Sequence, residues 1–186
     1  YLPELVIKPE GTIPEYGGGL CQVSSTIYRA ALMSGLPIVE RSPHSYAVSY
    51  YAQIYGYGLD ATIYIGVHDV KFINDTPGHI LIQAYAEGSQ AFFKFYGTDD
   101  GRSVALEGPY QGGYHGPGAP VIVEDPSLPP GTRRQVEYGH TGFNATWYRH
   151  MVKDGEEITE TIYSAYRAIP AKIVVGPSAD AVTEEE

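Results

Sequence analysis

The most reactive side chain in this sequence belongs to its single cysteine, Cys21, which follows three glycines ending at Gly19. Apolar residues recur after it at helical spacing, so we expect a helix over residues 21–34 with the thiol in its first turn. The positive end of the helix dipole and the unpaired backbone N–H groups there favour the nucleophilic thiolate. We expect Gly19, which lacks a side chain, to let a substrate approach the sulfur. The same position also suits an inert, packed cysteine.

A thiol nucleophile needs a base and a group that orients the base. Of the six histidines, His44 is the best candidate base, because it lies in the constrained segment Arg41-Ser42-Pro43-His44-Ser45 soon after the helix. A single histidine is more commonly a surface or structural residue. Asp60, at the start of an expected strand, is the candidate for orienting the imidazole. A turn role for Asp60 is the alternative, and Asp69 is a weaker candidate for the same task.

Three further side chains suit substrate binding. Arg41 could hold a substrate carboxylate through two parallel hydrogen bonds, although a surface ion pair with Glu40 is the simpler interpretation. Gln22 and the first backbone N–H groups of the helix could form an oxyanion hole. Ser24 and Ser25 more naturally satisfy backbone groups in the first helical turn.

Composition and spacing exclude several classes of function. The net charge of -10 argues against a nucleic-acid partner, since phosphates demand Lys and Arg, and against adsorption to anionic membranes. A single cysteine excludes an internal disulfide and a cysteine-rich zinc site, and the histidines and carboxylates lack metal-ligand spacing. The glycine run lacks the Lys and Ser/Thr of a phosphate-binding loop. We therefore expect neither a metal nor a cofactor.

The pattern of apolar residues predicts an α+β fold, with one main helix on an antiparallel β-sheet. Gly35 and Pro37 end the helix. Its apolar face is expected to hold Leu20, Val23, Ile27, Ala30 and Ala31, with Cys21, Ser25 and Tyr28 on the flank. Residues 11–14 are expected to form a turn, and strands are expected at 5–7, 37–40, 61–65, 70–74, 79–85 and 91–96.

A Gly/Pro-rich connector over residues 112–118 separates a second part of the chain. Strands are expected there at 121–123, 133–138, 145–152 and 158–164, with a hairpin turn at Asp154-Gly155, which predicts a small, extended all-β module. The expected domains are residues 1–105 and 106–178, followed by an acidic tail at 179–186. Because Tyr1-Leu2-Pro3 is typical of the interior of a domain, we expect the natural domain to begin before Tyr1.

Four motifs in the first part occur together in one known family. They are Tyr16-Gly17-Gly18-Gly19-Leu20-Cys21-Gln22-Val23-Ser24-Ser25, Glu40-Arg41-Ser42-Pro43-His44-Ser45, Gly58-Leu59-Asp60-Ala61-Thr62 and Asp69-Val70-Lys71-Phe72-Ile73-Asn74. In order and spacing, residues 1–97 resemble the VanW domain family. The second module, with Val123-Glu124-Asp125-Pro126-Ser127 and the later Gly139 and Gly142, looks like a G5 domain.

The resemblance implies an extracellular protein of the bacterial cell envelope, held at the membrane through an anchor that this chain lacks. Some VanW domains are implicated as cysteine L,D-transpeptidases that make 3-3 cross-links in peptidoglycan, and G5 domains are thought to bind polymers containing N-acetylglucosamine. The family's motifs map its cysteine to Cys21, its arginine to Arg41, its His-Ser pair to His44-Ser45 and its Asp to Asp60. The implied partners are peptidoglycan stem peptides and glycan.

Two alternatives remain open at this point. The chain could be a non-catalytic module that binds peptidoglycan or N-acetylglucosamine through tyrosines, of which there are 17, with Cys21 as a structural residue. It could also be a cysteine peptidase or carboxypeptidase of peptidoglycan, which would use the same residues and differ only in the acceptor.

Overall fold

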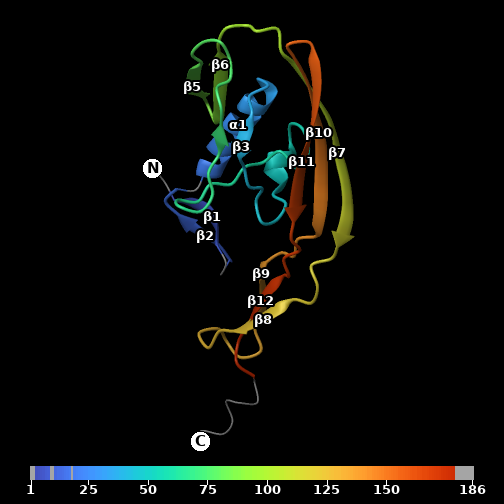
Figure 1. The fold of residues 1–186 in the computed structure, drawn as a ribbon. Helices are drawn as coiled ribbons and strands as arrows, with labels where there is room; N and C mark the ends of the chain where they lie inside the picture. The colour runs from blue at the N-terminus through green and yellow to red at the C-terminus, as the bar shows by residue number, and fades with distance from the viewer. Residues whose placement is uncertain (1–2, 9–10, 18, 179–186) are drawn as a thin grey trace, which may run out of the picture. The chain divides into compact units, whose positions relative to one another are not determined.

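The computed structural model describes residues 3–8, 11–17 and 19–178 (Figure 1). These residues form two compact units, the first from 1–44, 48–110 and 145–164 and the second from 45–47, 111–144 and 165–186. The predicted acidic tail at 179–186, and Gly18 in the glycine run, lie outside the described residues. Within the described part of the chain, no helix has the length and apolar character needed to cross a membrane.

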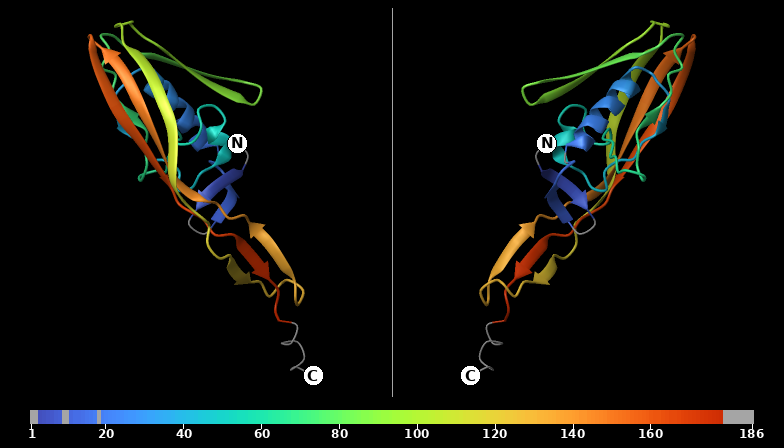
Figure 2. Two further views of the ribbon diagram at one scale, coloured as in Figure 1. Left: turned by 90° about the vertical axis from the view of Figure 1, so that its right-hand side faces the viewer. Right: turned by 90° about the vertical axis from the view of Figure 1, so that its left-hand side faces the viewer.

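Unit 1 is built around the single long helix α1 (Leu20–Met33). The short strands β3 (Ile38–Glu40) and β4 (Lys71–Phe72) pair with each other, and β5 (Leu81–Glu87) pairs with β6 (Gln90–Tyr96). Figure 2 shows the β5–β6 hairpin extending past α1. The 3₁₀ helix η1 (Ser49–Ala52) lies in the loop between β3 and β4. Before α1, β1 (Glu4–Lys8) and β2 (Gly11–Glu15) form an antiparallel hairpin.

Three long strands form the largest sheet, in the order β11-β10-β7, and supply residues to both units. They are β7 (Ser103–His115), β10 (Gly142–Lys153) and β11 (Glu156–Tyr166). The predicted Asp154-Gly155 turn joins β10 to β11, and both residues have the positive φ (53° and 79°) that a tight type I′ turn requires. The predicted connector over 112–118 is wrong in part, because β7 continues through His115.

The core of unit 1 joins segments that are far apart in the sequence. Tyr28 and Leu32 of α1 pack with Leu59, Ala61 and Trp147, and all five are at most 4% exposed. The helix ends as predicted, with Gly35 in the left-handed region at φ 71° and the Leu36 N–H donating to the Ala31 carbonyl. This cluster fixes the segment around Leu59 and Ala61 against α1, which positions Asp60.

The predicted apolar face of α1 is wrong in part, since Ala31 is buried as predicted but Leu20 and Val23 are not. Leu20 and Val23 are 51% and 42% exposed, whereas Ser24 and Ser25 are buried. The serines bury because Ala61 satisfies their hydroxyls: Ser24 Oγ donates to the Ala61 carbonyl at 2.6 Å, and the Ala61 N–H donates to Ser25 Oγ at 2.9 Å. The side of the helix predicted as its flank, with Ser25 and Tyr28, is therefore the buried side.

Other strand predictions also needed correction. Residues 11–14 form β2 rather than a turn, since they pair with β1. The predicted strand at 61–65 is reduced to single bridges, Thr62 to Ser42 and Tyr64 to His68. Residues 3–8, 11–17 and 19–178 hold one α-helix and mostly antiparallel sheets, so the fold is mostly β, and the helix rests on several small sheets rather than on one meander.

Unit 2 holds a three-stranded sheet in the order β8-β12-β9. Strand β12 (Lys172–Val175), which the sequence did not predict, pairs in parallel with β8 (Val121–Glu124) and antiparallel with β9 (Arg133–Glu137). Aromatic contacts support this unit, with ring centroids of Phe143 at 5.4 Å from Tyr114 and 5.2 Å from Tyr166. The predicted domain limits at 105/106 and 178/179 stay predictions.

Candidate active site

The Cys21 thiol lies in the first turn of α1, where the backbone turns sharply into the helix. Gly19 is the N-cap and has φ 88°, a conformation that glycine adopts without strain. Its carbonyl accepts the N–H groups of Gln22 and Val23, at 3.0 and 3.3 Å. The thiol is half-buried and faces the segment after Asp60, with Sγ 3.6 Å from Thr62 Oγ1 and 3.8 Å from the Ile63 carbonyl oxygen.

His44 is held by two hydrogen bonds to one carboxylate oxygen. Asp60 Oδ2 accepts the His44 backbone N–H at 2.7 Å and lies 2.6 Å from ring atom Nδ1. Both side chains are buried, with His44 5% and Asp60 3% exposed. With Nδ1 directed at the carboxylate, the other ring nitrogen is left for the thiol, the arrangement that a nucleophile, its base and an orienting acid share.

The electrostatics of this cluster favour a thiolate beside an imidazolium. Burial alone raises the pKa of Cys21, but hydrogen bonds with His44, the Ile63 backbone and Thr62 lower the pKa to about 7. Burial alone lowers the pKa of His44, whereas hydrogen bonds to Asp60 and Cys21 raise the pKa to about 9. The two groups titrate as a pair, so between these two values the sulfur is deprotonated while the ring keeps both protons.

Tyr51 of η1 is a part of the site that the sequence did not single out. Its ring stacks on the His44 ring, with centroids 4.6 Å apart and planes inclined by 21°. Burial first, and then the hydrogen bond with Tyr50, raise the pKa of Tyr51 above its ordinary value, so the phenol stays neutral. A neutral aromatic face against His44 fixes the ring plane, and only its occurrence within a tyrosine-rich segment could have suggested the role.

Arg41 lies behind Asp60 rather than open to solvent. Its Nε donates to the Asp60 carbonyl at 2.6 Å, Nη2 donates to the Gly58 carbonyl at 2.8 Å, and Nη1 donates to Ser164 Oγ at 2.8 Å. The Asp60 carboxylate lies 3.6 Å from Nη2, and the guanidinium rests 5.2 Å from the centre of the Tyr28 ring. These contacts make Arg41 a buried support for Asp60. Its predicted role in binding a substrate carboxylate stays a prediction.

The remaining predicted substrate residues are spread more widely. Gln22 and Gly19 are exposed beside Cys21, and since the Gln22 backbone N–H donates to Gly19, an oxyanion contact from Gln22 would use its side-chain amide. Ser45 belongs to unit 2, where its carbonyl accepts the Arg167 N–H at 2.8 Å. The structure thus brings Cys21, His44 and Asp60 together, with Arg41 behind them.

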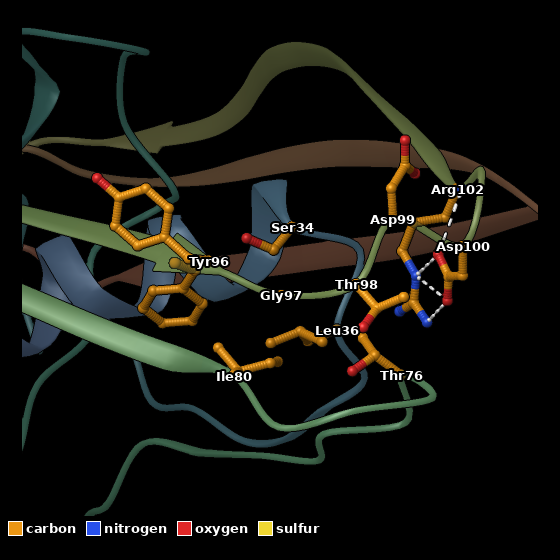
Figure 3. Close-up of a pocket in the computed structure, with 11 residues that line it drawn as sticks. Ser34, Leu36, Thr76, Ile80, Tyr96, Gly97, Thr98, Asp99, Asp100 and Arg102 are labelled. Carbon is orange, nitrogen blue, oxygen red and sulfur yellow. Dashed lines mark hydrogen bonds and ion pairs between the residues drawn. The ribbon is translucent and has the colours of Figure 1, made fainter.

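A separate pocket of about 130 Å³ lies at the other end of α1, and none of the predicted site residues lines it (Figure 3). Figure 3 shows Arg102 there, paired with Asp100. Among residues 3–8, 11–17 and 19–178, no cluster of three or more His, Cys, Asp or Glu side chains could hold a metal ion.

Comparison with known families shows where this arrangement belongs. The family model described as VanW like protein matches residues 1–96, which include Cys21, His44 and Asp60. The chain belongs to the VanW family. A second model, described as G5 domain, matches residues 117–178, so a G5 domain follows the VanW domain. VanW and G5 domains are typical of cell-wall-associated proteins, and this pair suggests a protein of that kind.

A relative and two solved structures resemble parts of the chain. "Uncharacterized protein YoaR" of Bacillus subtilis (strain 168) is 40% identical over 83 residues, which are 45% of this chain and 26% of that relative. A structure described as "IgA1 Protease G5 domain structure" has a TM-score of 0.26 at 20% identity, over 44% of this chain and 99% of its own. A second, "Crystal structure of HP0197-G5", has a TM-score of 0.21 at 19% identity, over 40% and 97%.

Proposed function

We propose that the VanW domain is a cysteine acyltransferase of the L,D-transpeptidase type, which forms 3-3 cross-links between peptidoglycan stem peptides. The observation that carries this proposal is the 2.6 Å contact between Asp60 Oδ2 and His44 Nδ1, beside a Cys21 thiol whose pKa His44 helps to lower to about 7. A cysteine at the start of a helix, without a base beside it, would not support this reaction. A cysteine whose histidine is oriented by a buried carboxylate has the parts of a thiol nucleophile.

In the first half-reaction, the Cys21 thiolate attacks the carbonyl carbon between the third and fourth residues of a donor stem peptide. The C–N bond breaks, His44 gives its proton to the departing amine of D-Ala, and a thioester on Cys21 remains. The Gln22 side-chain amide stabilises the oxyanion, since the backbone N–H groups of Gln22 and Val23 already donate to Gly19, and Gly19 leaves the approach open.

In the second half-reaction, the amine of a neighbouring stem peptide attacks the thioester, and His44 accepts a proton from that amine. The new amide is the 3-3 cross-link, and the thiolate is restored. Water in place of the amine would give carboxypeptidase activity with the same residues. The net charge of -10 does not repel a cationic acceptor.

The G5 domain has a separate proposed role, in binding wall glycan outside the cell. G5 domains are known to bind N-acetylglucosamine and cell-wall glycans. His140 of the G5 domain and Tyr46, which belongs to the same compact unit but to the VanW match, have ring centroids 4.5 Å apart with planes inclined by 34°, which offers an aromatic surface suited to a sugar ring. Binding of the chain to purified peptidoglycan, and its loss in His140→Ala, would test this role.

Intact-mass spectrometry tests the enzyme proposal. The protein is incubated with a tetrapeptide donor, and then with donor plus an amine-bearing acceptor. We expect a thioester adduct on the wild type, release of D-Ala and a cross-linked product, and no adduct on Cys21→Ala. An equal adduct on Cys21→Ala, or none on folded wild type, would overturn the proposal. Release of D-Ala without a cross-linked product would assign the peptidase instead.

A further inference from the structure

The Thr62 hydroxyl lies beside the Cys21 sulfur and is half-buried with it. Thr62 Oγ1 is 3.6 Å from Cys21 Sγ, within the range of a hydrogen bond to sulfur. Among residues 3–8, 11–17 and 19–178, the Thr62 side chain has no second hydrogen-bond partner. A hydroxyl has one proton to donate, and it rotates to suit its surroundings. The proton of Thr62 is therefore available to whichever atom beside Oγ1 carries negative charge.

The backbone that carries Thr62 is held by hydrogen bonds at two successive residues. The Thr62 N–H donates to the Ser42 carbonyl at 2.9 Å, in a β-bridge between these two residues. The preceding residue, Ala61, donates its N–H to Ser25 Oγ at 2.9 Å, and its carbonyl accepts the Ser24 hydroxyl at 2.6 Å. Thr62 is also β-branched, which restricts its χ1 angle. The hydroxyl oxygen is thus fixed before a substrate arrives, as electrostatic catalysis requires.

The same short segment carries the carboxylate that orients the base. Asp60 Oδ2 lies 2.6 Å from His44 Nδ1, and two residues later Thr62 contacts the nucleophile. The buried serines of α1 that hold Ala61, between these two positions, hold both side chains in register with the helix that carries Cys21. One rigid piece of backbone therefore places a group against the base and a second group against the sulfur.

The first turn of α1 uses several of its own N–H groups. The Leu20 N–H donates to the Gly17 carbonyl at 3.3 Å, and the N–H groups of Gln22 and Val23 donate to the Gly19 carbonyl at 3.0 and 3.3 Å. These three donors are consequently not free for a substrate oxygen. An oxyanion that forms beside this turn depends on side-chain donors, of which the exposed Gln22 amide is one.

The position of Thr62 suits the oxygen on which charge develops. When a thiolate attacks a carbonyl carbon, the carbonyl oxygen ends two bonds away from the sulfur. An oxyanion donor acts from about 2.7–3.1 Å away from that oxygen. Since Thr62 Oγ1 is 3.6 Å from Sγ, a carbonyl oxygen turned towards Thr62 lies within this range without any movement of the backbone. The Ile63 carbonyl, 3.8 Å from Sγ, is an acceptor and gives an oxyanion no such support.

We propose that the Thr62 hydroxyl is a catalytic hydrogen-bond donor, which follows negative charge from the Cys21 sulfur to the oxyanion. The inference rests on the proposed function and adds a donor to it. Before the reaction, the hydroxyl donates to the thiolate. As the S–C bond forms, the π electrons of the carbonyl move onto its oxygen, and the hydroxyl turns to donate to that oxygen. Its proton stays on Thr62. When the C–N bond breaks, the electron pair returns to the carbonyl, and His44 protonates the departing nitrogen.

Two simple reagents separate the two partners of this donor. Burial raises the pKa of Cys21, and hydrogen bonds with His44, the Ile63 backbone and Thr62 lower it, so loss of the hydroxyl should make the thiol less acidic. Iodoacetamide displaces iodide at a saturated carbon and forms no oxyanion. Acylation by p-nitrophenyl acetate passes through an oxyanion. Once the thiol is ionised, acylation should therefore need Thr62 and alkylation should not.

Both rates are measured by intact mass in the wild type and in Thr62→Val, and each is divided by the fraction of thiolate taken from the pH dependence of alkylation. Thr62→Val should slow acylation by about tenfold or more and change alkylation by less than about twofold. Thr98→Val replaces an exposed threonine at the other end of α1 and should change neither rate. Equal slowing of both reactions in Thr62→Val, or unchanged acylation, would overturn the inference.

A second pair of variants keeps the test independent of how Thr62→Val folds. Thr62→Ser retains a hydroxyl and Thr62→Ala lacks it, so the serine variant should acylate faster by about tenfold or more. Equal acylation by these two variants would also overturn the inference.

Because p-nitrophenyl acetate is not a stem peptide, the inference and the proposed function can fail separately. Slower acylation in Thr62→Val, with no release of D-Ala from a tetrapeptide by the wild type, would support the donor and reject the transpeptidase. Release of D-Ala at the wild-type rate by Thr62→Val would reject the donor and leave the proposed function standing. A wild-type thiol that is alkylated but never acylated would overturn both.

Discussion

Asp60 Oδ2 receives both the backbone N–H and the ring Nδ1 of His44, at 2.7 and 2.6 Å. One oxygen thus fixes the position of the histidine backbone and the orientation of its ring. Because the carboxylate also raises the pKa of the ring, and the ring helps to lower the pKa of Cys21, Asp60 acts on the thiol through His44.

Removing that carboxylate charge should make the thiol less acidic. In Asp60→Asn, the pKa of His44 falls, the imidazolium no longer supports the thiolate at neutral pH, and the pKa of Cys21 rises from about 7 towards its ordinary value of 9.0. The pH dependence of iodoacetamide alkylation measures this shift. Asp69→Asn is the matched control, since Asp69 is exposed and pairs with Lys71. A midpoint equally displaced in both variants would contradict the role given to Asp60.

The pH profile of the acyl-transfer rate should be bell-shaped. Below about 7 the thiol gains a proton and loses its nucleophilicity, and above about 9 His44 loses the proton that the departing amine needs. The rate should therefore be greatest between these values when kcat/KM for a tetrapeptide donor is followed against pH. A rate that still rises steadily beyond pH 9 would contradict the ion pair.

Substitution of Arg41 should lower the stability of the protein more than it weakens substrate binding. Arg41→Met removes the buried cation beside the Asp60 carboxylate and the donor to the Asp60 carbonyl, which should lower the free energy of unfolding by about 3 kcal/mol. Lys71→Met, which breaks the exposed pair with Glu40, should leave the unfolding curve nearly unchanged. Urea denaturation of both variants compares them. If Arg41→Met unfolds like the wild type but binds the donor peptide more weakly, the main role of Arg41 is to bind substrate.

Ser25 should hold α1 against the segment that carries Asp60 through buried hydrogen bonds. Its hydroxyl accepts the Ala61 N–H and donates to the Ala61 carbonyl, so Ser25→Ala leaves a buried donor unsatisfied and should cost about 1–3 kcal/mol. Thr26→Ala, on the exposed side of the same helix, should change stability by less than about 0.5 kcal/mol. Thermal unfolding compares the two variants, and equal destabilisation by both would contradict this role of Ser25.

The sequence predicted the helix well because its signals are local. Helical spacing after Gly19, together with Gly35 and Pro37, gave both ends of α1 to within one residue. The buried face was wrong because the partner of Ser24 and Ser25 is the backbone of Ala61, 36 or more residues away. The helical periodicity of the sequence carries no information on that contact, and hydrophobicity scales assign serines to the exposed face of a helix.

For the candidate site, the family motifs led to three side chains that the structure brings together, Cys21, His44 and Asp60. The surroundings of Arg41 could not be foreseen, because its acceptors are carbonyl oxygens at 58 and 60 and the hydroxyl of Ser164. The stacking of Tyr51 on His44 likewise depends on where η1 packs. Their catalytic roles stay predictions until they are measured.

The most direct test of the central claim is the thiol pKa of Cys21 in the wild type and in His44→Gln. Alkylation by iodoacetamide is followed from pH 5 to 10 by intact mass. The account predicts a wild-type midpoint of about 7 and a clear upward shift in His44→Gln, since the imidazolium is then gone. A wild-type midpoint near 9, unchanged by the substitution, would show that Cys21 is an ordinary thiol and would contradict the account.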